Sequence, residues 1–189
     1  MSQEQKIPKP VSPGSLRAAA LKYIDRFATS RENLRQVLMR RVQKSNYYHE
    51  TSIVEGMSWI EDLLNKLEAA NFINDAQYAE MRAGALHRKG TSLRVISMKL
   101  KEKGISDQYI ETALEALREE TQSENLERDA AIALARRRRL GPWRDPAKRN
   151  DLKEKDLAAM ARAGFSYDLA REIIEAENVK TLDPASSAG

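Results

Sequence analysis

The sequence contains no cysteine, which excludes disulfide bridges and thiolate metal sites. It also has no apolar run approaching the roughly 18 residues needed to cross a bilayer. The first 14 residues are polar and carry Pro8, Pro10 and Pro13, which is not the pattern of a secretory signal peptide. These absences favour a reducing compartment, and we expect a cytoplasmic protein without membrane association.

Residues that favour strands and tight turns are also scarce. Aromatic residues make up 6% of the 189-residue chain, and there are 8 Gly and 6 Pro, whereas charged residues reach 32%. Apolar residues instead recur at helical spacing, as at Ile53, Met57, Ile60 and Leu64, and no segment alternates apolar and polar residues over a useful length. The sequence therefore predicts an all-α protein of nine helices, most of about 10 to 15 residues.

Parts of the sequence repeat. The segment 100–106 (LKEKGIS) resembles 160–166 (MARAGFS), and each lies between two apolar helical stretches. Thr29-Ser30 and Thr91-Ser92 each precede apolar residues at the same two later positions. Such self-similarity predicts tandem helical units.

Three units of three helices are the simplest interpretation. We place helical repeats at 15–70, 71–120 and 121–178, between a disordered leader at 1–14 and a disordered tail at 179–189. Repeats that contact only their neighbours form an elongated and curved array, as in a solenoid. The first repeat lacks the glycine turn and is expected to carry a polar insertion at residues 44–51 instead. The alternative is three coincidental helical hairpins in one compact bundle.

Charge is segregated along the chain. The overall net charge is +4, but residues 15–44 carry +6, residues 45–135 carry −6, and residues 136–149 carry +6. Two basic blocks of this kind suit a polyanion, or an acidic protein surface, that is contacted at separated points.

The basic block around four consecutive arginines is the strongest candidate for partner binding. Four adjacent positions on a helix spread around most of its circumference, so at least one arginine is expected to pack along the bundle with its head in solvent. Trp143 either stacks on a base or fills the core. The predicted partner-binding residues are Arg136, Arg137, Arg138, Arg139, Trp143, Arg144, Lys148, Arg149, Arg31 and Arg35. The alternative to a partner-binding surface is a basic helix end that is simply solvated.

Nothing in the sequence indicates catalysis. The only histidines, His49 and His87, lie far apart, and no phosphate-binding glycine loop or nucleophile motif is present. We expect no enzyme activity, no cofactor and no metal.

The order of several short motifs resembles the RecX family. These are residues 67–79 (LEAANFINDAQYA), 88–90 (RKG) and 100–105 (LKEKGI), and the similarity extends over roughly residues 16–176. The resemblance implies three tandem three-helix repeats. It also implies binding along the groove of the RecA–single-stranded-DNA filament, with inhibition of ATP hydrolysis, strand exchange and filament growth. The resemblance thus connects the protein with DNA repair, recombination and the SOS response.

The partners expected from this resemblance are the RecA filament, the single-stranded DNA within it and, weakly, naked DNA. We expect a monomer. The alternative is an autonomous DNA-binding protein of helix-turn-helix type, acting in transcription or DNA architecture. An autonomous binder should hold duplex DNA at physiological salt, whereas a filament modulator needs RecA.

Overall fold

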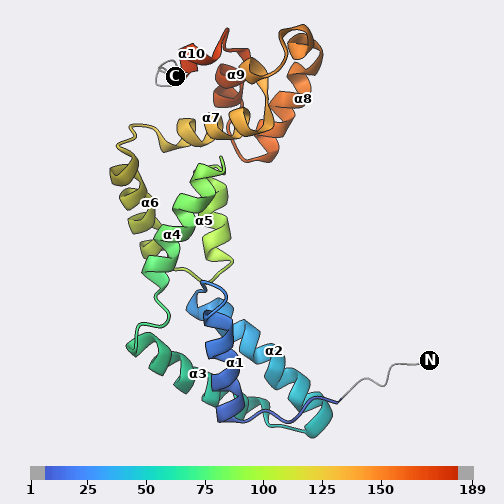
Figure 1. Ribbon diagram of the computed structural model, residues 1–189, viewed down its shortest axis with the longest axis vertical. Helices are drawn as coiled ribbons and strands as arrows, with labels where there is room; N and C mark the ends of the chain where they lie inside the picture. Colours follow the sequence, from blue (N-terminus) through green and yellow to red (C-terminus); the bar gives the residue numbers. More distant parts are fainter. Residues whose placement is uncertain (1–6, 183–189) are drawn as a thin grey trace, which may run out of the picture. The chain divides into compact units, whose positions relative to one another are not determined.

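The computed structural model describes residues 7–182, which form α-helices joined by short turns (Figure 1). This part of the chain contains ten α-helices, two 3₁₀-helices and no strand. The helices are α1 (Pro13–Ile24), α2 (Arg31–His49), α3 (Ile53–Ala69), α4 (Asp75–Arg88), α5 (Leu93–Lys101), α6 (Asp107–Thr121), α7 (Leu126–Arg138), η1 (Gly141–Trp143), η2 (Pro146–Lys148), α8 (Arg149–Arg162), α9 (Tyr167–Glu175) and α10 (Val179–Leu182). The predicted all-α class is confirmed. The elongated, curved arrangement stays a prediction.

Serine side chains begin several of these helices. Ser30, Ser52, Ser92 and Ser166 each accept a hydrogen bond from the backbone N–H three residues later. Such a cap satisfies one of the N–H groups that the first turn of a helix leaves without a partner. The positions of these helix starts are therefore determined by local sequence.

No helix within residues 7–182 is both long and apolar enough to span a membrane.

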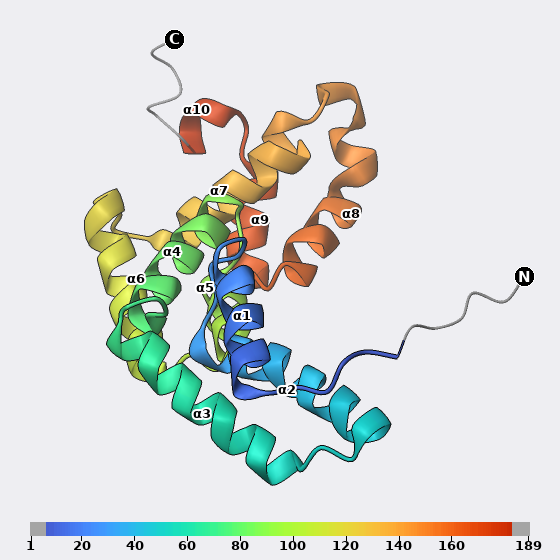
Figure 2. The ribbon, with the colours of Figure 1, turned by 60° about the horizontal axis from the view of Figure 1, so that its bottom comes forward.

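The chain divides into two compact units. The first comprises the chain up to Tyr78 together with Lys103–Ser106. In it α1, α2 and α3 pack against one another in pairs (Figures 1 and 2). The buried core is formed by Leu16, Ala20, Leu34, Leu38, Val42, Ile60, Leu63, Leu64, Leu67 and Ile73. None of these buried residues is aromatic, and the aromatic residues Tyr23 and Trp59 pack against them only partly buried.

The second unit comprises Ala79–Glu102 and the chain from Asp107 onward. Its main core lies among α7, α8, α9 and η1, where α9 packs against both α7 and α8. Helix α7 contributes the buried small residues Ala130, Ala131 and Ala135, which allow close approach of the neighbouring helices. This core places the end of α7, with its arginines, at the surface of the unit.

The ends of the described chain differ from the prediction. The Val11 N–H donates to Ser45 Oγ at 3.0 Å and Ser12 caps α1, so this helix begins at Pro13 rather than at Ser15. The short helix α10 lies within the predicted disordered tail, because Leu182 is buried in the core of the second unit. The rest of the predicted leader and tail, residues 1–6 and 183–189, lies outside the described residues.

The predicted polar insertion at 44–51 is mostly helix. Helix α2 continues to His49 because Ser45 is buried and its Oγ lies 2.7 Å from Thr51 Oγ1. Glu50 then ends the helix in the left-handed conformation, with φ of 57°. One buried serine, which periodicity alone had assigned to a loop, thus lengthens α2.

Candidate partner-binding site

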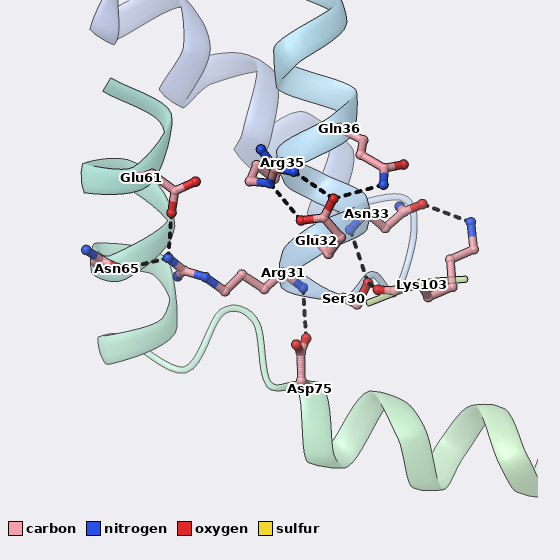
Figure 3. Close-up of polar contacts among 10 residues, drawn as sticks. All are labelled: Ser30, Arg31, Glu32, Asn33, Arg35, Gln36, Glu61, Asn65, Asp75 and Lys103. Atoms are coloured by element: carbon pink, nitrogen blue, oxygen red, sulfur yellow. Dashed lines mark hydrogen bonds and ion pairs between the residues drawn. The ribbon is translucent and has the colours of Figure 1, made fainter. Parts of the chain in front are cut away.

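The start of α2 contacts two segments that the sequence assigns to the second repeat (Figure 3). Ser30 Oγ donates to the backbone carbonyl of Lys103 at 2.5 Å. The backbone N–H of Arg31 donates to Asp75 Oδ1 at 2.8 Å. At Gly104, whose φ is +75°, an added Cβ would lie 2.3 Å from the Cβ of Glu32. We call this set of contacts the first joint.

The start of α5 makes the equivalent contacts within the second unit. Ser92 Oγ donates to the carbonyl of Ala163 at 2.9 Å, and the Leu93 N–H donates to Glu127 Oε2 at 2.7 Å. Gly164 has φ of +93°, and an added Cβ would lie 2.5 Å from Ser92 Oγ. We call this set the second joint.

The two joints explain why the repeated motifs occur together in the sequence. In each, the serine that caps a helix also binds the residue before a left-handed glycine, and a later carboxylate accepts the first N–H of that helix. The Thr-Ser motif of one repeat and the glycine turn of the next are therefore binding partners, which sequence analysis recognised only as repeat markers.

Arg31 and Arg35, two predicted partner-binding residues, are used inside the first unit. The Arg31 guanidinium donates to Glu61 at 2.9 Å and to Glu68 at 3.0 Å, both on α3. Arg35 binds both oxygens of Glu32, at 2.6 and 2.9 Å, which lowers the pKa of that carboxyl. Neither arginine is an open cation, because acidic residues of the same unit balance both charges.

Arg144 is likewise engaged, by a buried carboxylate. Its guanidinium binds both oxygens of Asp156, at 2.6 and 3.0 Å, and Asp156 also accepts the Gly141 N–H at 3.0 Å. The Asp156 side chain is only 3% exposed, and its hydrogen bonds raise the pKa of Arg144. This pair fixes η1 against α8.

Asp156 is the residue that sequence analysis missed. It lies four residues before Met160, which the repeat aligns with Leu100, so its counterpart in the second repeat is the buried Ile96. A charged residue in an apolar register was the available signal, since a buried charge requires a partner.

Arg149 and Trp143 also make contacts within the second unit. Arg149 donates to the backbone carbonyls of Pro142 at 2.7 Å, Arg144 at 3.3 Å and Glu177 at 3.0 Å. Trp143 is half-buried and packs against the core. Of the two roles considered for this tryptophan, its packing supports filling the core.

The four consecutive arginines are all exposed, as is Lys148. Helix α7 ends at Arg138. Arg139 takes the left-handed conformation, with φ of 54°, so it does not continue the helix. The expectation that at least one of these arginines packs along the bundle with its head in solvent stays a prediction. Within residues 7–182, Arg137, Arg138 and Arg139 have no ion-pair partner. We call Arg136–Arg139 the α7 arginine surface.

These features define a helical protein of related three-helix units that presents a cationic helix end to solvent. No group of three His, Asp or Glu side chains in the described part of the chain could hold a metal ion. Residues 74–114 match the family model for the second three-helix domain of RecX.

The full chain shows the same relationship. It is 40% identical over 171 residues to the regulatory protein RecX of Myxococcus xanthus, covering 90% of this chain and 89% of that protein. RecX of Corynebacterium efficiens is 33% identical over 88% of this chain and 75% of its own length. The crystal structure of RecX from Lactobacillus salivarius superposes with a TM-score of 0.54 and 26% identity, covering 86% of this chain and 94% of that one. The chain belongs to the RecX family of regulatory proteins.

The second joint should not tolerate a side chain at Gly164. We expect Gly164→Ala to lower the free energy of unfolding by about 2 kcal/mol or more, because the methyl group meets Ser92 and the backbone is left-handed. Gly14→Ala is the control: its Cβ would lie 4.0 Å from the nearest atom, so stability should stay within about 1 kcal/mol of wild type. Urea unfolding measures both, and equal losses would contradict a tight joint.

The Arg144–Asp156 pair should behave as a coupled unit. Arg144→Met leaves the buried carboxylate without its cation and should reduce stability by about 2–4 kcal/mol. Adding Asp156→Leu, which restores the apolar register, should recover most of that loss and give a coupling of at least about 1 kcal/mol. A double-mutant cycle in urea measures the coupling, with exposed Arg171→Met as the control. Strictly additive losses would show that the pair is not coupled.

The first joint should weaken as pH rises through the acid range. Burial raises the pKa of Asp75, with a smaller opposing effect of its hydrogen bond from Arg31. The folded protein therefore keeps this proton at a pH where the unfolded chain, with a pKa of about 3.9, has released it. The stabilisation from Asp75 is thus fullest below that value and declines as pH rises through the folded pKa.

Asp75→Asn keeps the acceptor for the Arg31 N–H but does not titrate. The stability of wild type relative to Asp75→Asn should fall between about pH 3 and pH 7, measured by urea unfolding at each pH. The neighbouring Glu61, Glu68 and Arg31 are present in both proteins. A relative stability that increases with pH would show that the carboxylate form is favoured by folding.

Proposed function

We propose that this protein regulates the RecA recombinase by binding the RecA–single-stranded-DNA filament, and that it inhibits ATP hydrolysis, strand exchange and filament growth. It acts in the cytoplasm, in DNA repair and recombination, as a binding protein rather than an enzyme. Membership in the RecX family of regulatory proteins supports this function.

The observation that carries the proposal is the exposure of the α7 arginine surface. Of the arginines that the sequence nominated, four make internal contacts, namely Arg144, Arg149, Arg31 and Arg35. In contrast, Arg137, Arg138 and Arg139 are exposed and form no ion pair within residues 7–182. Guanidinium groups bind phosphate and carboxylate through paired N–H donors. A nucleoprotein filament offers both kinds of acceptor.

Inhibition would be steric. A protein with three-helix units in tandem can contact more than one subunit of a filament, and such contacts hinder the rearrangement that each cycle of ATP hydrolysis requires. The arginines supply attraction, and the acidic middle of the sequence either acts as a spacer or meets basic groups of the recombinase. Titrating this protein into the DNA-dependent ATPase reaction of RecA, at several salt concentrations, tests the proposal directly.

Reversing charge on the α7 arginine surface should weaken filament binding. We expect Arg137→Glu/Arg138→Glu to lower the affinity for the RecA filament at least tenfold at physiological salt. The slope of the logarithm of the binding constant against the logarithm of the salt concentration should become shallower by about 0.7 for each phosphate contact that is lost. The control is Arg94→Glu/Arg118→Glu, which makes the same charge change at exposed sites elsewhere in the second unit. Unchanged inhibition by the α7 variant at moderate salt would exclude this surface.

The autonomous DNA-binding alternative predicts a different result. Such a protein should bind naked duplex DNA at physiological salt with a steep salt dependence, and RecA should add nothing. A regulator of the filament should bind much more tightly when RecA coats the DNA. Measuring affinity for duplex, single strand and RecA-coated strand under one condition distinguishes the two.

A further inference from the structure

A groove runs between α1 and α3 on the first unit, away from the arginines of α7 in the sequence. Its volume is about 710 Å³. It is lined by Pro13, Gly14, Arg17 and Leu21 of α1, by Trp59, Asp62, Leu63, Lys66 and Leu67 of α3, and by Ala70 and Phe72 beyond α3. None of these residues belongs to the joints or to the α7 arginine surface.

The groove has the dimensions of a helix-binding site. The residues that line it along α3 and at its C-terminal cap recur every three or four positions from Trp59 to Ala70, which spans about 17 Å at 1.5 Å per residue. Its floor is apolar, with Leu63 and Leu67 buried, and its edges expose Leu21 (36%) and Phe72 (56%). A partner helix places apolar side chains along such a groove at every third or fourth position.

No residue from 7 to 12, the described chain before α1, lines this groove. The Val11 N–H donates to Ser45, and the Pro8 carbonyl lies 2.6 Å from His49 Nε2, so the segment leading into α1 is held against α2. Every described residue that lines the groove falls between Pro13 and Phe72. Among the described residues, nothing covers the apolar side chains of Leu21 and Phe72, which remain exposed.

The charges at the edges indicate the chemistry of that partner. Arg17 and Lys66 are exposed and form no ion pair with the described part of the chain, while Asp62 is the single acidic lining residue. A nucleic acid would bring phosphates against Asp62 and would leave the apolar floor unused. A protein helix with one apolar face and an acidic residue beside it satisfies both the floor and the two cations.

We propose that the α1–α3 groove binds an amphipathic helical segment of the recombinase. Apolar side chains of this segment occupy the floor, and an adjacent Asp or Glu meets Arg17 and Lys66. The identity of the partner rests on the proposed function, but the groove acts separately from the α7 arginine surface. It provides a protein-to-protein contact alongside the contact made by the arginines.

Single substitutions in the groove test the proposal with the full chain and purified RecA filaments on single-stranded DNA. Leu21→Glu and Lys66→Glu should each weaken binding at least tenfold, whereas Lys66→Arg should bind as wild type. Val54→Glu, at a 76% exposed apolar residue of α3 outside the groove, and Lys22→Glu on α1 are the matched controls. Circular dichroism melts establish that each variant folds.

Cross-linking identifies the occupant. Because the chain contains no cysteine, Ala70→Cys can carry a single photo-reactive group at the groove, and Val54→Cys carries the same group outside it. We expect Ala70→Cys alone to cross-link to one helical RecA segment with an acidic residue beside its apolar face. A cross-link to DNA, to a second copy of this chain, or to a segment without an acidic residue would overturn the proposal.

The two proposals fail in distinguishable ways. If the groove variants bind as wild type while Arg137→Glu/Arg138→Glu is weakened, the groove proposal is overturned and the proposed function stands. If the wild-type protein does not bind RecA filaments, both are overturned.

Discussion

The start of a helix is the structural constraint on which both units of this protein depend. The first turn of any helix leaves backbone N–H groups without partners, and burying them requires acceptors. At α2 and at α5 a serine supplies one acceptor, and a carboxylate from a later helix supplies another. The same serine donates its proton to a carbonyl beside a left-handed glycine. Each helix start is therefore also an attachment point for a later segment of the chain.

A buried charge decides which cations the second unit presents. Asp156 occupies a position that is apolar in the other repeat. Its carboxylate forms an ion pair with Arg144 and accepts a hydrogen bond from the Gly141 N–H. The 3₁₀ segment that follows α7 is thereby fixed against α8, with Arg149 hydrogen-bonded to its carbonyls. The positive charge of residues 136–149 thus separates into an internal part, which maintains the fold, and an exposed part at Arg136–Arg139 and Lys148.

The two proposed contact surfaces differ in their physics. The α7 arginine surface offers charge with little apolar area, so its attraction is long-ranged and sensitive to salt. The α1–α3 groove offers apolar area edged by two cations, so its attraction depends mainly on shape and burial. A ligand made of both protein and nucleic acid could be recognised by using the two surfaces together.

The sequence alone determined the helical class, many of the helix starts and the left-handed turns at Gly104 and Gly164, because capping serines, helical periodicity and glycine act over a few residues. It also placed the basic run at the end of a helix. It did not reveal that α2 continues to His49, that Leu182 is buried, or which arginines remain open to solvent. Those outcomes depend on groups that are distant in the sequence, such as Val11 beside Ser45 and Asp156 beside Arg144. Only the tertiary structure decides them, since the partner of a charge or of a buried hydroxyl is fixed by how helices pack and not by neighbouring residues.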